Sequence, residues 1–312
     1  MTAADLATRF VANGVNDLGS HPQDTPLNIN MRSFLLGSLA ATALAADCTR
    51  ELLKGVSDSL ISAHTAGDPT LIKPVADTVE YTENFKPATM KTGILSHAMK
   101  PDHTRSSLDT TQCATYTELI FATNPKPYVI GVQMYLKDNK VAKIEKVITT
   151  TGDWLFNATG TLSFASKESW DTIPEAKRDT REVIKAAADA YLDLFSDKTV
   201  KVPWGTPCAR LEGGISTGKG LPDDSCAVGV PDGVKLTNRR YVIDETVGAV
   251  DVFLTFGSGL PDSHEFRVEG GKLRFVHTIT FMNGSPGPGG KGKAKGKSPA
   301  GTGGFVKMIR GA

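Results

Sequence analysis

The chain has 312 residues, of which 40% are apolar and 22% are charged, and its formal net charge is +1. This length is comfortable for two domains, and the composition supplies a core for each. A charge so close to zero gives no basic field, so nucleic acid is not an expected partner. No apolar run reaches the roughly 20 residues that a membrane helix needs, so no membrane partner is expected either.

The N-terminal region carries a targeting pattern. Residues 1–30 are polar and without periodicity, and we predict that they are disordered or an extension from a misassigned start. Residues 31–46 combine one basic residue, Arg32, with a short apolar stretch and a small-residue cleavage site, Ala43-Leu44-Ala45. This is the pattern of a secretory signal peptide, and a short buried helix is the alternative. The mature chain is therefore expected to be secreted and to begin near Asp47.

An internal repeat predicts two similar halves. Thr49-Arg50-Glu51-Leu52-Leu53-Lys54 recurs as Thr180-Arg181-Glu182-Val183-Ile184-Lys185, and Asp58 matches Asp189. Apolar residues follow each hexapeptide at helical spacing, so both copies should open amphipathic helices, the second one capped by Asp179. The expected apolar stripes are Leu52, Leu53, Val56, Leu60 and Ile61, and Val183, Ile184, Ala187, Tyr191 and Leu194.

The rest of each half is predicted to form β-strands. A short strand with a glutamate is expected after each helix, at 79–83 and 208–212, and β-branched and aromatic runs follow a long loop. Residues 109–119 align with 244–254. Polar turns at 138–140 and 270–272 predict a closing hairpin in each half. The predicted fold class is α+β, with one half over 47–166 and the other over 167–282.

The four cysteines are Cys48, Cys113, Cys208 and Cys226, and none has C-x-x-C spacing. An even number behind a signal peptide predicts two disulfides rather than a zinc site. Three pairings are possible, and we expect the one that keeps each bond within a half, Cys48–Cys113 and Cys208–Cys226. Asn157 opens an Asn-Ala-Thr triplet, which predicts N-glycosylation.

The C-terminal residues 283–312 form a Gly/Lys-rich tail that we expect to be disordered, because Gly, Lys, Pro, Ser and Ala dominate it up to residue 304. The lysines at 291, 293, 295 and 297 suggest a polyanion-binding tail. A solvated tail, or read-through of non-coding sequence, is the simpler interpretation.

Five stretches are long and specific: Tyr81-Thr82-Glu83-Asn84 and residues 109–116, 152–157, 202–208 and 236–242. They resemble a family of secreted fungal proteins that is described only as a domain of unknown function. By its plan, each half also resembles the NTF2-like superfamily, which includes ketosteroid isomerases, scytalone dehydratase and SnoaL-type polyketide cyclases. This resemblance implies two tandem cone-shaped α+β barrels, each a helix packed on a curved antiparallel sheet around a pocket. Two such halves in one chain imply a monomer that is an internal pseudo-dimer.

The superfamily resemblance implies a cofactor-free isomerase, dehydratase or cyclase acting on a small hydrophobic or phenolic metabolite. The alternative is a secreted protein that binds a small ligand or a surface without chemistry. Catalysis predicts a buried, desolvated Glu or His in an enclosed apolar cavity. Binding alone predicts a shallower, aromatic-lined groove with its acids at the rim. Six scattered histidines give no metal-binding pattern.

In the first half, the catalytic candidates follow from what proton abstraction needs: a base in an apolar site and a group that stabilises the enolate. The candidates are Glu83 or His103 as base, and Tyr81, Arg105 or Tyr116 as stabiliser. Tyr81 and Glu83 share a strand face by period-two spacing, and so do Tyr116 and Glu118. In the alternative interpretation the glutamates face solvent, the tyrosines pack in the sheet and residues 103–105 form an exposed loop.

In the second half, the ligand-binding candidates are Trp204, Arg240 and His277. His277 lies on the apolar face of the run 275–279, from which it would point into the cone. The alternative is a hydrogen-bonded core histidine. Arg240 would bind a ligand carboxylate, or else pair with Asp244 across a turn.

Overall fold

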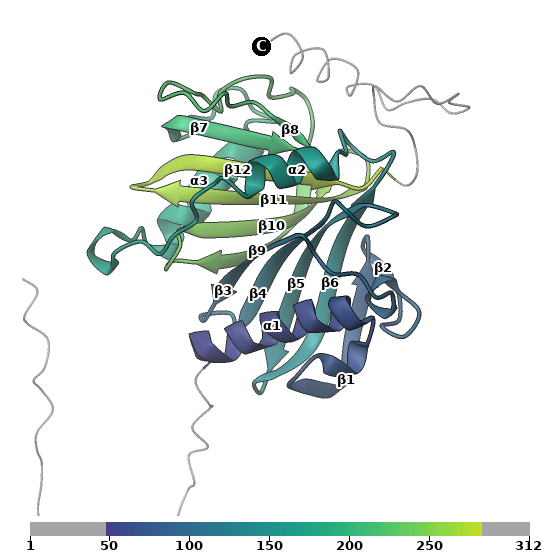
Figure 1. Ribbon diagram of the computed structural model, residues 1–312. Coiled ribbons are helices and arrows are strands. Elements are labelled where there is room, and N and C mark those ends of the chain that lie inside the picture. The colour runs from purple at the N-terminus through teal and green to yellow at the C-terminus, as the bar shows by residue number, and fades with distance from the viewer. Residues whose placement is uncertain (1–47, 283–312) are drawn as a thin grey trace, which may run out of the picture. The chain divides into compact units, whose positions relative to one another are not determined.

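The computed structural model describes residues 48–282 (Figure 1). The predictions for residues 1–30, for the signal peptide at 31–46 and for the tail at 283–312 lie outside this range. Within it, the α-helices are α1 (Arg50–Ala66), α2 (Ala158–Ala165) and α3 (Arg181–Asp193), and the short 3-10 turns are η1 (Pro69–Leu71), η2 (Ile94–Ser96) and η3 (Glu175–Lys177). None of these helices is both long and apolar enough to cross a membrane.

Two six-stranded sheets complete the fold. The first contains β1 (Val75–Glu83), β2 (Lys86–Pro87), β3 (His103–Asp109), β4 (Ala114–Phe121), β5 (Tyr128–Lys137) and β6 (Lys140–Thr150), in the order β2-β1-β6-β5-β4-β3. The second contains β7 (Trp204–Glu212), β8 (Ile215–Ser216), β9 (Leu236–Asp244), β10 (Ala249–Phe256), β11 (Leu260–Glu269) and β12 (Lys272–Thr280), in the order β8-β7-β12-β11-β10-β9. The two orders are equivalent.

The α+β class is therefore confirmed, with one correction. The sheets are mixed rather than antiparallel, because β1 runs parallel to β6 and β7 runs parallel to β12. The predicted hairpins are present, and their turns use left-handed backbone at Asp138-Asn139 and at Gly270-Gly271.

The repeated hexapeptide begins each long helix with a threonine cap. The hydroxyl oxygen of Thr49 accepts a hydrogen bond from Leu52 N at 3.2 Å, and that of Thr180 accepts one from Val183 N at 3.4 Å. Such a cap satisfies an N–H group that has no partner within the helix. The prediction that Asp179 caps the second helix is wrong, because the helix begins one residue later.

Each helix buries one face on the sheet of its own half. Val183 departs from the predicted stripe because it is 40% exposed, one position before the buried Ile184. Six positions of the predicted stripes are buried to within 2% of full burial: Leu53, Val56 and Leu60 in α1 and Ile184, Ala187 and Tyr191 in α3.

The arginine of each hexapeptide reaches the opposite half. Arg50 donates to Asp244 at 2.7 and 2.8 Å, and Arg181 donates to Asp109 at 2.8 and 2.6 Å. Each aspartate is buried at the end of β9 or β3 and also accepts a backbone N–H of the other half at 2.8 Å. This reciprocity is the pattern of a twofold dimer contact, built here within one chain.

The sheet faces turned away from α1 and α3 pack on each other. Strands β3 and β9 lie side by side in this contact (Figure 1). Side-chain alternation therefore sends each strand residue either toward a helix or toward the other sheet. The apolar residues shared between the sheets include Ala114, Tyr116 and Ile120 from the first and Val242, Phe253 and Ile279 from the second.

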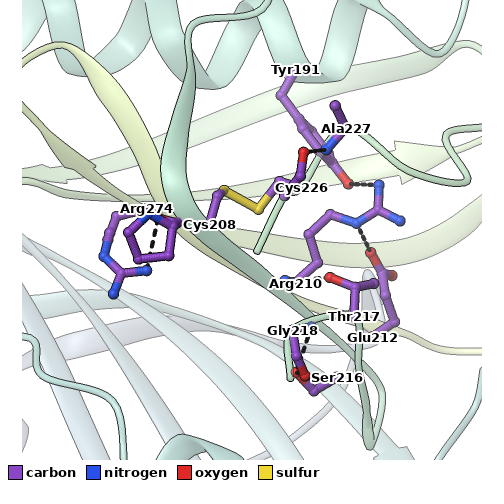
Figure 2. Close-up of a disulfide and its surroundings, with 12 residues drawn as sticks. Tyr191, Cys208, Arg210, Glu212, Ser216, Thr217, Gly218, Cys226, Ala227 and Arg274 are labelled. Carbon is purple, nitrogen blue, oxygen red and sulfur yellow. Dashed lines mark hydrogen bonds and ion pairs between the residues drawn. A yellow bond between two sulfur atoms is a disulfide. The ribbon is translucent and has the colours of Figure 1, made fainter. Parts of the chain in front are cut away.

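Both predicted disulfides are present. Cys48–Cys113 joins the start of the described chain to the β3–β4 turn, with an S–S distance of 2.09 Å. Cys208–Cys226 joins β7 to the loop that precedes β9 (Figure 2), with an S–S distance of 2.03 Å. Because disulfides persist in oxidising compartments, both bonds fit an extracellular location.

Candidate functional site

The residues predicted for the two cones lie in several places rather than in one interior per half. The reason is side-chain alternation, which sends neighbouring strand positions to opposite faces of a sheet. Two of them, Tyr81 and Glu83, lie beneath α1. Four lie between the two sheets, namely His103, Arg105, Tyr116 and His277. Trp204 begins β7, and Arg240 borders a surface pocket.

A fully buried lysine lies beneath α1. Lys146 of β6 is 0% exposed, and its Nζ lies 2.8 Å from Nε2 of His64, which is equally buried. Within residues 48–282 no carboxylate forms an ion pair with this amine. Burial lowers the pKa of Lys146 to about 7, although the Glu83 carboxylate opposes the shift. Burial and then Lys146 lower the pKa of His64 well below its usual value. Near neutral pH, an uncharged imidazole therefore faces an amine that readily loses its proton.

Tyr81 and Glu83 form the neighbouring part of this interior. Tyr81 Oη donates to Glu83 Oε1 at 2.6 Å, and Ile94 N of η2 donates to the same oxygen at 2.6 Å. Burial and the Glu83 carboxylate raise the pKa of Tyr81, so its phenol stays protonated. Met99 N donates to His64 O at 2.8 Å. The segment from Ile94 to Met99 is thus held at two points, by the Glu83 carboxylate and by the backbone carbonyl of His64.

The side chains around this polar group are apolar. The Phe121 ring lies 5.6 Å from the His64 ring. An apolar interior disfavours the ammonium form of a lysine, which explains the lowered pKa of Lys146. The apolar neighbours include Leu60, Leu95, Met99, Phe121, Ile144 and Ile148.

Lys146 and His64 were missed in the sequence, although a signal existed. Period-two spacing puts Lys146 between Ile144 and Ile148 on one strand face, where a solvent-facing lysine does not belong. His64 follows Leu60 by one helical turn, on the buried stripe of α1.

The equivalent interior of the second half has a different charge arrangement (Figure 2). Strand register places Arg210 and Glu212 where the first half has Tyr81 and Glu83. Arg210 is fully buried, with Nε 3.4 Å from Glu212 Oε1, and its Nη1 donates to Tyr191 Oη at 3.4 Å. Here the buried cation has a carboxylate beside it, as a structural ion pair requires.

A second polar cluster lies between the sheets. Arg105 Nη2 lies 2.5 Å from Glu265 Oε2 and 3.1 Å from Glu118 Oε2. His277 Nδ1 donates to Glu118 Oε1 at 2.9 Å. His103 is partly exposed on the same face of β3 as Arg105, so the expectation of an exposed loop at these positions is wrong. Four strands from both halves build this cluster.

Charge partners decide the protonation of the cluster. Burial opposes the charged form of His277, but Glu168 and Glu118 outweigh it and raise its pKa to about 10. Burial likewise opposes ionisation of Glu118, but Arg105 and His277 lower its pKa to about 2. Burial raises the pKa of Glu265, and the nearby Glu118 carboxylate adds to the shift.

Two residues between α2 and η3 pack over this cluster. Glu168 Oε2 accepts a hydrogen bond from His277 Nε2 at 2.7 Å and another from Trp170 Nε1 at 2.9 Å. The Trp170 ring centre lies 3.9 Å from the Arg105 guanidinium carbon. We call residues 166–172 the strap. Nothing in the sequence singled it out, because it carries no periodic pattern.

Two expectations for the second half are wrong. His277 faces the first sheet rather than α3, because its hydrogen-bond partners are Glu118 and Glu168. Arg240 does not pair with Asp244, which is bound by Arg50. Instead, Arg240 Nε donates to Glu145 Oε2 at 3.0 Å.

Arg240 also borders a pocket of about 320 Å³ at the junction of the halves. Its cations are already paired: Lys143 and Arg240 with Glu145, and Arg239 with Asp189. The rings of Tyr135 and Tyr241 complete a polar, aromatic lining. The lining residues are Gln112, Tyr135, Lys143, Arg239, Arg240 and Tyr241.

The other predicted residues have structural contacts. Tyr116 is buried between the sheets, with Oη 3.4 Å from Ser263 Oγ. Trp204 packs edge-on against Tyr191 at 5.8 Å. Asn157 is exposed as the N-cap of α2, where its Oδ1 accepts a backbone N–H at 3.0 Å. Glycosylation of this asparagine stays a prediction.

Glu118, Glu265 and His277 place candidate metal-ligand atoms within 4.8 Å of one another. The Arg105 guanidinium, however, already contacts both glutamates. The Arg105 guanidinium therefore occupies the position in which a metal ion would bind the two carboxylates, so these three residues do not fit a metal centre.

Residues 177–280 match a family model described as a domain of unknown function (DUF8021). The match spans α3 and the whole second sheet, and it agrees with the part of the resemblance that concerns a domain of unknown function. A comparison with curated proteins found no match. Neither comparison names an activity, so function rests on the sites themselves.

Proposed function

We propose that this protein is a secreted, cofactor-free enzyme that moves a proton on a small hydrophobic carbonyl compound in the interior beneath α1. Isomerisation, dehydration and cyclisation all use such a step. The observation that carries the proposal is Lys146, a fully buried amine whose hydrogen-bond partner is a neutral histidine. A base with a pKa near the working pH is suited to take a proton next to a carbonyl.

Each polar residue of this interior has a role in the proposed step. Lys146 Nζ takes the proton, and the C–H electron pair moves to the carbonyl oxygen to form an enolate. The new ammonium group stabilises the enolate and returns the proton at a different position. His64 orients the amine. Glu83 accepts the phenol hydrogen of Tyr81, and this bond holds the Tyr81 ring, whose centre lies 5.6 Å from Lys146 Nζ, beside the amine.

The environment indicates the substrate class. The surrounding side chains are aliphatic and aromatic, which suits a hydrophobic molecule rather than a sugar or a phosphate. Entry requires the segment around η2 to move, because Ile94 N and Met99 N are bonded to Glu83 and His64. A helix across a sheet with a polar group at the buried end is also the arrangement that the NTF2-like resemblance implies.

The test is proton exchange on simple ketones. Wild-type protein is incubated in D₂O with a panel of hydrophobic β,γ-unsaturated ketones, and deuterium uptake is followed by NMR. Lys146→Met should lower the exchange rate by about 100-fold or more. Lys143→Met, on the same strand but bordering the surface pocket, is the matched control and should retain the rate. Exchange that is no faster than in buffer, or equal in wild type and Lys146→Met, would overturn the proposal.

A second candidate is ligand binding without chemistry, which the pocket bordered by Arg240 favours. Its cations and tyrosines would contact a polar aromatic ligand at the junction of the halves. Under this alternative, Arg240→Ala and Tyr135→Ala weaken the binding of such a ligand, and Lys146→Met has no effect. Equilibrium dialysis of phenolic compounds against the three variants separates the two candidates.

A further inference from the structure

The strap places a carboxylate, from Glu168, and an aromatic ring, from Trp170, against the cluster between the sheets. A small aromatic acid would offer the same two groups in one molecule. The Glu168 carboxylate accepts from His277 Nε2 at 2.7 Å. The Trp170 indole lies over Arg105 at 3.9 Å and stacks on Phe275, with ring centres 5.8 Å apart and an interplanar angle of 26°. The hydrogen bond from Trp170 Nε1 to Glu168 joins ring and carboxylate into one unit.

The cluster also holds polar atoms that the strap leaves unused. Arg105 Nε and Nη1 are buried, and among residues 48–282 they have no hydrogen-bond partner. The Glu118 side chain is 1% exposed. A buried donor without an acceptor is costly, so an acidic ligand that reaches the free Arg105 nitrogens gains affinity from pairing them.

Charge balance favours the replacement of the Glu168 carboxylate by the carboxylate of a ligand. Arg105 and His277 supply the positive charge, and Glu118, Glu265 and Glu168 are the acids that face it. A ligand carboxylate in place of Glu168 leaves the net charge of the buried group unchanged. A neutral ligand would leave His277 Nε2–H without an acceptor.

The strap is able to leave without disrupting a sheet. Residues 168–174 belong to no helix or strand, and Lys167, Ser169 and Asp171 are exposed on either side of the two inward-pointing residues. The chain is anchored again from Asp171 onward. Asp171 O accepts a hydrogen bond from Arg267 Nη1 at 2.9 Å, and Ile173 N donates to Thr246 O at 2.8 Å.

We propose that Arg105 and His277 form a binding site for a small aromatic carboxylate, and that Glu168 and Trp170 occupy this site as an internal substitute for the ligand. The site lies on the face of the first sheet opposite to Lys146, so it does not depend on the proposed enzymatic function. Because the strap competes with the ligand, the apparent affinity of the wild-type protein is reduced by the fraction of molecules in which the strap is closed.

The test uses indole-3-acetate as the probe and the full chain, with binding measured by isothermal titration calorimetry. The double variant Glu168→Gln, Trp170→Ala should bind the probe about tenfold more tightly than wild type. Adding His277→Gln to the double variant should remove that gain. Glu175→Gln, an exposed acid in η3, is the control and should bind as wild type does. Indole, which lacks the carboxylate, should show no gain in the double variant.

Three results would overturn the proposal: a folded double variant that binds no more tightly, a gain that survives His277→Gln, or an equal gain for indole. If the double variant does not fold, Glu168→Gln alone decides the matter. This substitution keeps the shape of the side chain and Trp170, and it should tighten binding about threefold. Equal affinity of Glu168→Gln and wild type would then exclude the site.

Discussion

Lys146 and His277 are almost equally buried, but their pKa values move in opposite directions. Lys146 forms no ion pair with a carboxylate in the described part of the chain, so burial dominates and its pKa falls to about 7. His277 has Glu118 and Glu168 within 2.9 Å, and these partners raise its pKa to about 10 against the effect of burial. The comparison teaches that charge partners, not depth, set the protonation state. Lys146 is suited to accept a proton, and His277 is held as a cation.

The largest expected effect comes from removing a partner at the His277 site. Glu118→Gln leaves Arg105 and His277 with one carboxylate fewer in a buried setting, and breaking a buried pair in this way costs about 3–5 kcal/mol of the free energy of unfolding. Urea denaturation at pH 7 measures the loss. Glu175→Gln is the control and should change the value by less than about 0.5 kcal/mol. A loss below about 1 kcal/mol for Glu118→Gln would show that the carboxylate does not hold the two cations.

A gain of stability is expected at the Lys146 site. Lys146→Met removes an amine that has no buried carboxylate partner, so the variant should be more stable by about 2 kcal/mol at pH 6. The native pKa of about 7 lies below the unfolded value of 10.5, so the unfolded state binds more protons between these limits. Wild-type stability therefore rises with pH across this window. The advantage of Lys146→Met should be largest below pH 7 and should shrink toward pH 10.5, and a pH-independent difference contradicts the assignment.

The opposite pH dependence is expected for His277, and measured over one pH unit it is the smallest of the three effects. The native pKa of about 10 lies above the unfolded value of 6.5. The stabilising contribution is therefore complete below pH 6.5 and is lost as the pH rises through 10. Between these two values the stability difference changes by about 1.4 kcal/mol per pH unit. Denaturation of wild type and His277→Gln at pH 7.5 and pH 8.5 should therefore show the difference falling by about 1 kcal/mol. A difference that grows with pH would reverse the comparison.

The fold was largely accessible from the sequence because the repeat encodes it at several levels. The Thr49 and Thr180 hydroxyls cap the helices, and Arg50 and Arg181 bind Asp244 and Asp109 across the halves. Those two aspartates were aligned in the sequence, but their role as mutual partners was not evident. The reason is that a contact between halves leaves no local pattern.

The candidate sites were accessible only in part. Period-two spacing brought Tyr81 and Glu83 together correctly, and the structure joins them by a hydrogen bond of 2.6 Å. Arg105 and His277 were both selected, but as members of separate cones. They meet because the two sheets pack face to face, and the Arg105–Glu265 ion pair spans 160 positions in the sequence. Alternation along one strand gives the face of a residue but not what that face packs against.

The protonation of Lys146 is the most direct test of the account. Protein labelled in the lysine side chains is titrated by NMR, and the Lys146 signal is assigned as the one that Lys146→Met lacks. A midpoint near pH 7 is expected for this signal. A midpoint near 10.5, the ordinary value for a lysine, would contradict it.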